Sequence, residues 1–474
     1  MFKVLYAEIL AWHGLIMGHF ERGVFLQDGE GGSHGAFINA VRELSGLEAW
    51  RLCDGDPTVA RDLLARLYCA LSEAAEPLRI GRVDRYVEQE IDAKVQEIGT
   101  GLDAPNGSFW PDFDSVSAEE IFDAAFLAMR MLDERLSQET CVLIPELLDE
   151  FKTKSGYFVV PCRKIFGDRE RLTGQGLSRR GLLYHRIVPV QYDGVRLALN
   201  IHPDVGLSHV QLPPKRKVGA AVFPELKLET CPSEMNASGN FVVTGVTSVP
   251  QQEQVVASQC QGAVADRCDT LVWPELTMPP ERVEQVRSLL RKSSLNGDRP
   301  AVVVAGSWHV EDEKRIRNRS EVLDGRGEQL LSFDKCLAYM KRGTPDGGAE
   351  DIEPGEVVQL LLAEDELIVF MICLDFCHVN REALLRACDA SLVIVTSMGE
   401  RSTIREHTAR AASLKTTNNT RTVVVQQSVK QAEPSDNTQI GYILPGLAKP
   451  QELKEDDTLT SQCFSSFYTE CEES

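Results

Sequence analysis

The segment with the clearest chemical meaning runs from Leu367 to Asp375. An apolar, β-like run ends at Cys373, and a turn and a helix-like segment follow it. A thiol at the tip of a rigid strand is well placed to act as a nucleophile. Two other strand-like runs end in Glu275 and Lys335. A carboxylate can take the proton of a thiol, and a cation stabilises the thiolate and the oxyanion of a tetrahedral intermediate. These residue types predict acyl transfer to a cysteine.

The elements that must position these residues alternate between strand and helix from residue 241 onward, a pattern typical of an α/β domain. Strands are predicted at 241–246, 270–273, 301–305, 328–333, 367–372, 391–395 and 422–426. Helices are predicted at 251–265, 281–292, 381–388 and 404–414. The three candidate residues follow the strands at 270–273, 328–333 and 367–372, so we expect them at strand ends.

Three motifs in this part of the chain resemble those of the nitrilase, or carbon–nitrogen hydrolase, superfamily. The first is the strand ending in Pro274-Glu275-Leu276. The second runs from Asn318-Arg319-Ser320 through a Gly-containing turn to Asp334-Lys335. The third is Ile372-Cys373-Leu374-Asp375. The resemblance covers about residues 240–450. The fold class it implies is α/β, a nitrilase-like α-β-β-α sandwich in the C-terminal half. The residue patterns before it predict an N-terminal helical plus β-rich region.

The resemblance also implies roles for residues of this chain. Glu275 would be the general base, Cys373 the nucleophile that forms a thioester, and Lys335 the cation that stabilises the oxyanion. A second Glu of the family lies between the Lys and the Cys, and the candidates here are Glu350, Glu353 and Glu356. Glu350 is preferred because it lies several residues before Pro354-Gly355.

Two more residues are candidates for positioning the substrate. The backbone N–H of Leu374, directly after the nucleophile, is a candidate oxyanion donor. His309 lies in a region that lines the pocket in the family, and a structural role is an equal alternative.

The assignment of the base has two rivals, because Pro-Glu-Leu also occurs around Glu146 and Glu225. Glu146 is far from the other motifs, whereas Glu225 follows a strand-like run. Glu275 is preferred because a predicted helix precedes its strand, as the family order requires.

Leu374-Asp375 stands where the nitrile-cleaving branch of the family has Trp-Glu, which favours an amide-type small-molecule substrate. The predicted function is therefore cysteine-dependent hydrolysis of a non-peptide C–N bond, with a bacterial defence effector as one possible context. The alternative is a catalytically silent scaffold for oligomerisation or sensing. The family resemblance also predicts a homo-oligomer. No cofactor is expected, and no metal, because Cys377-His378 lacks a second ligand pair at zinc spacing.

Secondary structure can also be predicted for the rest of the chain. Residues 1–150 are expected to be mostly helical, with helices at 57–75, 82–98 and 118–136, and residues 151–230 to be β-rich. Strands are predicted at 157–160, 187–190, 195–201 and 220–223, an exposed turn at 213–217 and a linker at 230–240. Residues 451–474 are predicted to form an acidic tail. The N-terminal region is a candidate surface for a protein partner.

The composition of the chain indicates which binding partners and which cellular compartment to expect. The net charge of −21 disfavours binding to nucleic acid or to an anionic membrane. No apolar run approaches the ~20 residues that span a bilayer. The 13 cysteines are scattered without a framework, and no signal-peptide pattern follows the first residues. A reduced, cytoplasmic setting is the expectation.

Overall fold

The computed structural model of the 474-residue chain describes its elements in separate stretches. The described residues are 34–46, 56–74, 92–96, 110–138, 148–162, 182–202, 205, 216–224, 226–232, 240–246, 252–293, 300–313, 315–340, 348–363, 366–418, 420–429, 440–444, 457–459 and 465–469.

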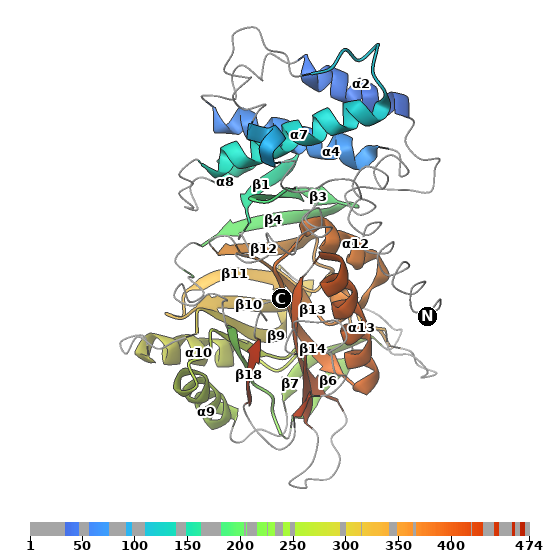
Figure 1. Ribbon diagram of the computed structural model, residues 1–474. Coiled ribbons are helices and arrows are strands. Elements are labelled where there is room, and N and C mark those ends of the chain that lie inside the picture. The colour runs from blue at the N-terminus through green and yellow to red at the C-terminus, as the bar shows by residue number, and fades with distance from the viewer. Residues whose placement is uncertain are drawn as a thin grey trace, which may run out of the picture.

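Two mixed sheets form the larger part of the described structure (Figure 1). The six-stranded sheet has the order β11-β10-β9-β8-β5-β18, and the eight-stranded sheet has the order β17-β16-β15-β14-β13-β12-β4-β3. The first comprises β5 (Arg216–Ala220), β8 (Thr270–Trp273), β9 (Val302–Asp312), β10 (Arg315–Asp324), β11 (Gln329–Asp334) and β18 (Ser465–Thr469). The second comprises β3 (Gln191–Tyr192), β4 (Val195–Ile201), β12 (Val357–Ala363), β13 (Glu366–Ile372), β14 (Leu392–Gly399), β15 (Arg421–Ser428), β16 (Gly441–Leu444) and β17 (Asp457–Leu459).

The two sheets pack face to face and are covered by helices on their outer faces. On β13, Ile368, Phe370 and Ile372 face the other sheet, and Leu367, Val369 and Met371 face the helices. A strand buried on both faces needs a continuous apolar run, which explains the sequence of β13. Helices α9 (Gln252–Ala265) and α10 (Pro280–Ser293) cover the six-stranded sheet. Helices α12 (Val379–Cys388) and α13 (Arg401–Asn418) cover the eight-stranded sheet, on the opposite side in Figure 1. The predicted α/β class and four-layer sandwich are confirmed.

Strands from outside residues 241–450 complete both sheets. β4 pairs in parallel with β12, and β5 pairs in parallel with β8. β18, from the segment read as an acidic tail, pairs antiparallel with β5. The expected boundary near residue 241 therefore does not separate the sandwich from the preceding β-rich region. Local periodicity detects a strand but not its distant partner.

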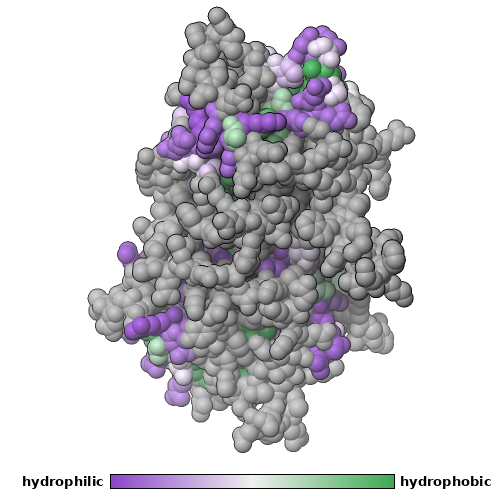
Figure 2. Space-filling view, viewed as in Figure 1, coloured by the Kyte–Doolittle hydropathy of each residue, from purple (hydrophilic) through white to green (hydrophobic). Residues whose placement is uncertain are grey.

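A cluster of helices packs at one end of the sandwich. α2 (His34–Ser45), α4 (Pro57–Glu73) and α7 (Ala118–Ser137) share one apolar core. Ser117 caps α7 through a reciprocal capping box with Glu120. The described side chains of these upper helices are mainly hydrophilic on the face seen in Figure 2. Each helix therefore buries one apolar stripe and exposes a polar one.

The hairpin of β1 (Tyr157–Pro161) and β2 (His185–Pro189) joins these helices to the sandwich. Val159 packs in the helical core, whereas Phe158 and Val160 pack in the core beneath α12 and α13. Alternate residues of a strand point to opposite faces, so one hairpin can contact both parts. Asp133 of α7 adds a polar link, because its carboxylate accepts hydrogen bonds from the Leu183 and Tyr184 amides.

Most of the elements predicted from the sequence are confirmed within the described residues. The helix expected at 404–414 is α13, and the helix expected at 57–75 is α4. Three predictions need correction. Arg216 and Lys217, placed in an exposed turn, begin β5, while residues 221–223 follow that strand. The expected linker begins inside β6 (Leu228–Pro232), which pairs with β7 (Phe241–Val246). Only residues 92–96 of the helix expected at 82–98 are described.

The remaining described helices are α8 (Leu148–Phe151) and α11 (Leu374–Cys377). In the described stretches no helix combines the length and the hydropathy that crossing a membrane requires. The same stretches hold no group of three His, Cys, Asp or Glu residues arranged to bind a metal ion.

The contact between the sheets can be tested at Phe370, which is 2% exposed and packs against Phe333 with ring centroids 5.6 Å apart. We expect Phe370→Ala to lower the free energy of unfolding by about 3–5 kcal/mol, since it leaves a cavity between two sheets. Urea denaturation measures this loss, with half-buried Phe113→Ala in the helical part as the milder control. A loss below about 1 kcal/mol would contradict this packing.

Candidate active site

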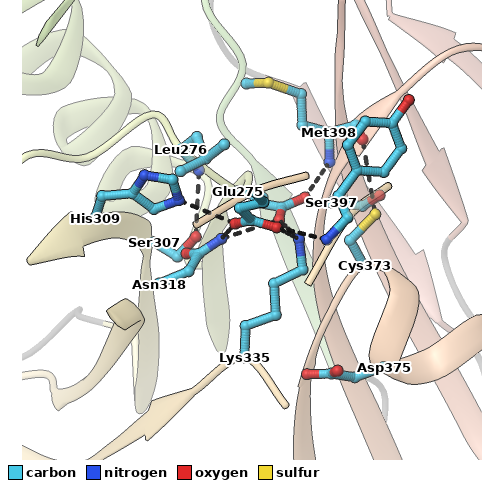
Figure 3. A network of polar contacts seen from close by, with 12 residues as sticks. Glu275, Leu276, Ser307, His309, Asn318, Lys335, Cys373, Asp375, Ser397 and Met398 are labelled. Atoms are coloured by element: carbon cyan, nitrogen blue, oxygen red, sulfur yellow. Dashed lines mark hydrogen bonds and ion pairs between the residues drawn. The ribbon is translucent and has the colours of Figure 1, made fainter. Parts of the chain in front are cut away.

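Neighbouring strands of the six-stranded sheet carry polar side chains to one place (Figure 3). Glu275 follows β8, His309 lies on β9, Asn318 on β10, and Lys335 follows β11. His309 and Asn318 are direct cross-strand partners, and the Lys335 amide donates to the Asn318 carbonyl at 2.8 Å. Directly opposed residues on adjacent strands have Cβ atoms about 5 Å apart. The pairing register therefore places these side chains side by side.

Lys335 links two buried carboxylates. Its Nζ atom lies 2.7 Å from Glu275 Oε1 and 2.6 Å from Glu350 Oε2. All three side chains are at most 3% exposed. Asn318 Nδ2 donates to both carboxylates as well, at 3.1 Å to Glu275 and 2.9 Å to Glu350. Two carboxylates and one ammonium leave this cluster with a net charge of −1.

Glu350 is the Glu that the structure places beside Lys335, among the candidates predicted from the sequence. Glu353 pairs with Arg315 at 2.8 Å on the surface, and Glu356 is an exposed residue beside Arg196. The segment that carries Glu350 is held in place by Phe241 of β7, which bonds the Ala349 carbonyl and the Asp351 amide. The preference for Glu350 thus agrees with the observed geometry.

His309 contacts Glu350. Its Nδ1 atom accepts a hydrogen bond from the Val243 amide at 2.8 Å, so Nε2 carries the proton. Nε2 then donates to Glu350 Oε1 at 2.9 Å. The imidazole is nearly fully buried beside this carboxylate, so its observed contact is to Glu350.

Cys373 follows β13 in a strained conformation. Its φ is 44° and its ψ is −103°, values that residues with a side chain rarely adopt. The Cys373 amide donates to the Thr396 carbonyl at 2.8 Å, and the His407 imidazole lies 3.4 Å from the Cys373 carbonyl oxygen. Such strain persists only where surrounding contacts impose it, and it is concentrated at functional sites. Leu276, the residue after Glu275, is also in the left-handed region, with φ 55°.

Met398 connects the candidate base to the candidate nucleophile, as Figure 3 shows. Its amide donates to Glu275 Oε2 at 3.1 Å, and its carbonyl oxygen lies 3.7 Å from Cys373 Sγ. Met398 is near the end of β14, which runs parallel to β13. The carboxyl ends of parallel strands share one sheet edge, so Cys373 and Met398 emerge together next to Glu275.

The electrostatic environment keeps the thiol protonated at rest. Burial and the negative charge of Glu275 raise the pKa of Cys373 well above its usual value, while Lys335 and Ser397 lower it less. Burial also acts against the charge of Lys335, but Glu275 and Glu350 raise the Lys335 pKa above its usual value. Burial opposes ionisation of Glu350, yet Lys335 and His309 lower its pKa to about 2. Lys335 and Glu350 are therefore charged, and Cys373 needs a base to ionise.

Leu374 begins α11, directly after Cys373. The first amides of a helix have no partner within that helix, which is the property expected of an oxyanion donor. Asp375 accepts a hydrogen bond from the Cys336 amide at 2.9 Å, so it joins the turn after Cys373 to the residue after Lys335. Burial raises the pKa of Asp375 to about 7.

Some residues of the site had no role assigned from the sequence. Asn318 belongs to the motif Asn318-Arg319-Ser320. Its side chain is buried because alternate residues of β10 are buried, which only the structure shows. Met398 contributes through its backbone, for which residue type gives no signal. The rival bases Glu146 and Glu225 lie outside the described residues.

Comparison with known proteins gives structural likeness only. No family model and no curated protein matches the sequence. Three solved structures each match 54% of this chain. The first is the glutamine-dependent NAD+ synthetase of Acinetobacter baumannii, with 16% identity, 45% of its own chain covered and a TM-score of 0.37. The second is an amidase from Nesterenkonia sp., with 15% identity, 89% of its own chain covered and a TM-score of 0.33. The third is Nit3 from Saccharomyces cerevisiae, a member of branch 10 of the nitrilase superfamily, with 14% identity, 89% of its own chain covered and a TM-score of 0.35. The chain spans less than half of the length of the synthetase.

The charge environment of Cys373 predicts how its alkylation depends on pH. In the wild type, the rate of labelling by iodoacetamide should still rise above pH 9, because burial and Glu275 oppose ionisation. Glu275→Gln removes the negative charge and leaves Lys335, so the profile should move to lower pH by about one unit. Mass spectrometry of the Cys373 peptide measures both rates.

Glu253→Gln on α9 is the matched control, because this exposed carboxylate lies beside Arg282 and is not among the groups that shift the Cys373 pKa. It should leave the alkylation profile unchanged. Labelling of Cys373 that is complete below pH 8, or that is unaffected by Glu275→Gln, would contradict the described electrostatics.

Proposed function

We propose that this protein hydrolyses a non-peptide carbon–nitrogen bond through a thioester on Cys373. The observation that carries the proposal is the convergence of Cys373, from one sheet, with Glu275 and Lys335, from the other. Met398 contacts both Glu275 and Cys373. A protonated buried thiol beside a carboxylate and a fixed cation is suited to base-assisted attack on a carbonyl carbon.

The first half of the proposed reaction forms the acyl-enzyme. Cys373 Sγ attacks the amide carbon while Glu275 takes the thiol proton. The carbonyl oxygen becomes an oxyanion, for which the Lys335 ammonium and the Leu374 amide are the nearby donors. The C–N bond then breaks, and Glu275 returns the proton to the leaving nitrogen. The products of this half are a thioester on Cys373 and ammonia or an amine.

The second half reuses the same groups. Glu275 takes a proton from water, the resulting hydroxide attacks the thioester carbon, and the C–S bond breaks to release a carboxylic acid. The proton returns to the sulfur, and the thiol is restored. Glu350 also accepts a hydrogen bond from Lys335, so that the ammonium stays in place while Glu275 changes charge.

An amide is the proposed substrate in preference to a nitrile. The support is Leu374-Asp375, which stands where the nitrile-cleaving branch of the resembled family has Trp-Glu. The proposed reaction needs no redox or metal cofactor, since the thiol, the carboxylate and the ammonium supply the nucleophile, the proton transfers and the charge stabilisation.

Ammonia release from a panel of amides, carbamoyl compounds and nitriles tests the proposal. Cys373→Ala should abolish the release, and Glu275→Gln should lower kcat by about 10²–10⁴-fold, the usual contribution of a general base. Cys377→Ala, four residues from the nucleophile, is the matched control and should retain activity.

The alternative function is a catalytically silent scaffold. It predicts no Cys373-dependent turnover of any compound in the panel, and a biological function that survives Cys373→Ala. That pair of results would overturn the proposed hydrolase. Turnover of nitriles alone would retain the thioester chemistry and overturn the choice of amides.

A further inference from the structure

The exposed large hydrophobic side chains are not scattered over the described residues. They are Tyr339, Met340 and Val429, which are 48%, 61% and 57% exposed. We refer to these three residues as the apolar rim. Single exposed apolar residues are common on protein surfaces and carry no meaning by themselves. These three differ, because Tyr339 and Met340 lie on a segment that pairs with the one carrying Glu350, and Val429 contacts the residue that follows Met398.

Tyr339 and Met340 follow Lys335 along the chain and pair with the segment that carries Glu350. The Tyr339 amide donates to Glu350 Oε2 at 2.9 Å, and the Glu350 amide donates to the Tyr339 carbonyl at 2.8 Å. Met340 forms a β-bridge with Ala349. This part of the rim therefore lies directly beside a buried carboxylate of the site while its side chains reach solvent.

Val429 belongs to the other sheet and follows β15. Gly399 and Ser428 are paired at the ends of β14 and β15, and the Val429 amide approaches the Gly399 carbonyl at 3.4 Å. Gly399 directly follows Met398, which contacts Glu275 and Cys373. The rim thus has one part attached to each of the sheets that supply the catalytic residues.

An apolar cluster continues from the base toward β7. Leu276, Trp308 and Val243 form its buried centre, and Met398 packs against them. Leu276 directly follows Glu275, and Met398 bonds both Glu275 and Cys373. One residue adjacent to Glu275 and one bonded to both Glu275 and Cys373 therefore belong to an apolar cluster.

The charges at the site disfavour an anionic substrate. Lys335 is the cation at its centre, and both Glu275 and Glu350 already bond its ammonium. With a net charge of −1, the cluster repels a carboxylate on a bound molecule. An apolar rim beside such a cluster suits a neutral molecule.

We propose that the apolar rim binds an alkyl or aryl group of the substrate, so that the site selects neutral carboxamides with an apolar side group. This inference rests on the proposed function and specifies its substrate class. Removal of that group from water would add to binding in proportion to the apolar area buried.

Matched amides test the selection. We expect kcat/KM to be about tenfold higher for hexanamide than for acetamide, because each added methylene buries apolar surface. Succinamate, which carries a carboxylate, should be a poorer substrate than either. Tyr339→Ser and Val429→Ser should each reduce the preference for hexanamide over acetamide severalfold, whereas Tyr339→Phe, which keeps the apolar ring, should retain it.

A binding measurement makes the test independent of turnover. Each amide is added during alkylation of Cys373 by iodoacetamide, and protection is followed by mass spectrometry. Hexanamide should protect at about a tenfold lower concentration than acetamide, and Tyr339→Ser should remove most of this difference.

Three outcomes would overturn the inference. They are equal protection by hexanamide and acetamide, a preference for succinamate, or rim variants that change the oligomeric state without changing selectivity, which would make the rim a contact between copies. If Cys373-dependent hydrolysis occurs without an apolar preference, this inference fails alone. If no compound is hydrolysed, the proposed function fails, while the protection data still decide whether the rim binds apolar groups.

Discussion

The double ion pair of Lys335 with Glu275 and Glu350 is the interaction on which the rest of the site depends. Burial of charges is costly unless they are paired and hydrogen-bonded, and removal of one partner of a buried pair typically costs about 3–5 kcal/mol. The three side chains come from the end of β8, the end of β11 and the segment before β12. Their mutual attraction therefore fixes the relative positions of three separate parts of the chain. Asn318 and His309 supply further hydrogen bonds to the carboxylates.

This cluster also determines the state of the nucleophile. Cys373 is held in a left-handed conformation at the end of a strand that is buried on both faces. Its sulfur faces a site whose net charge is negative, which favours the neutral thiol over the thiolate. A thiol that stays protonated until a carbonyl carbon is present avoids unproductive reactions, provided that Glu275 accepts its proton at that moment. The same carboxylate thus suppresses ionisation at rest and assists it during attack.

Much of this site could be predicted from the sequence, because Glu275, Lys335 and Cys373 each follow a locally recognisable apolar strand. Glu350 could be chosen over its neighbours because of its distance from Pro354-Gly355. Asn318 and Met398 could not be assigned roles, since their contributions depend on cross-strand register and on backbone contacts. The same limit applies to the fold. β4 and β12 are adjacent in the sheet although more than 150 residues separate them, as Val357 pairs with Arg196. Their pairing is set by the shared core and not by any local pattern.

The central claim is that Cys373 carries the acyl group during turnover. It is tested most directly by acid quenching of the enzyme during steady-state hydrolysis of an amide, followed by tandem mass spectrometry of the peptide that contains Cys373. The account predicts an added acyl mass on the Cys373 sulfur, and an increment that changes with the acyl part of the amide used. Continued turnover with no acyl group on Cys373, or with the acyl group on another residue, would contradict it.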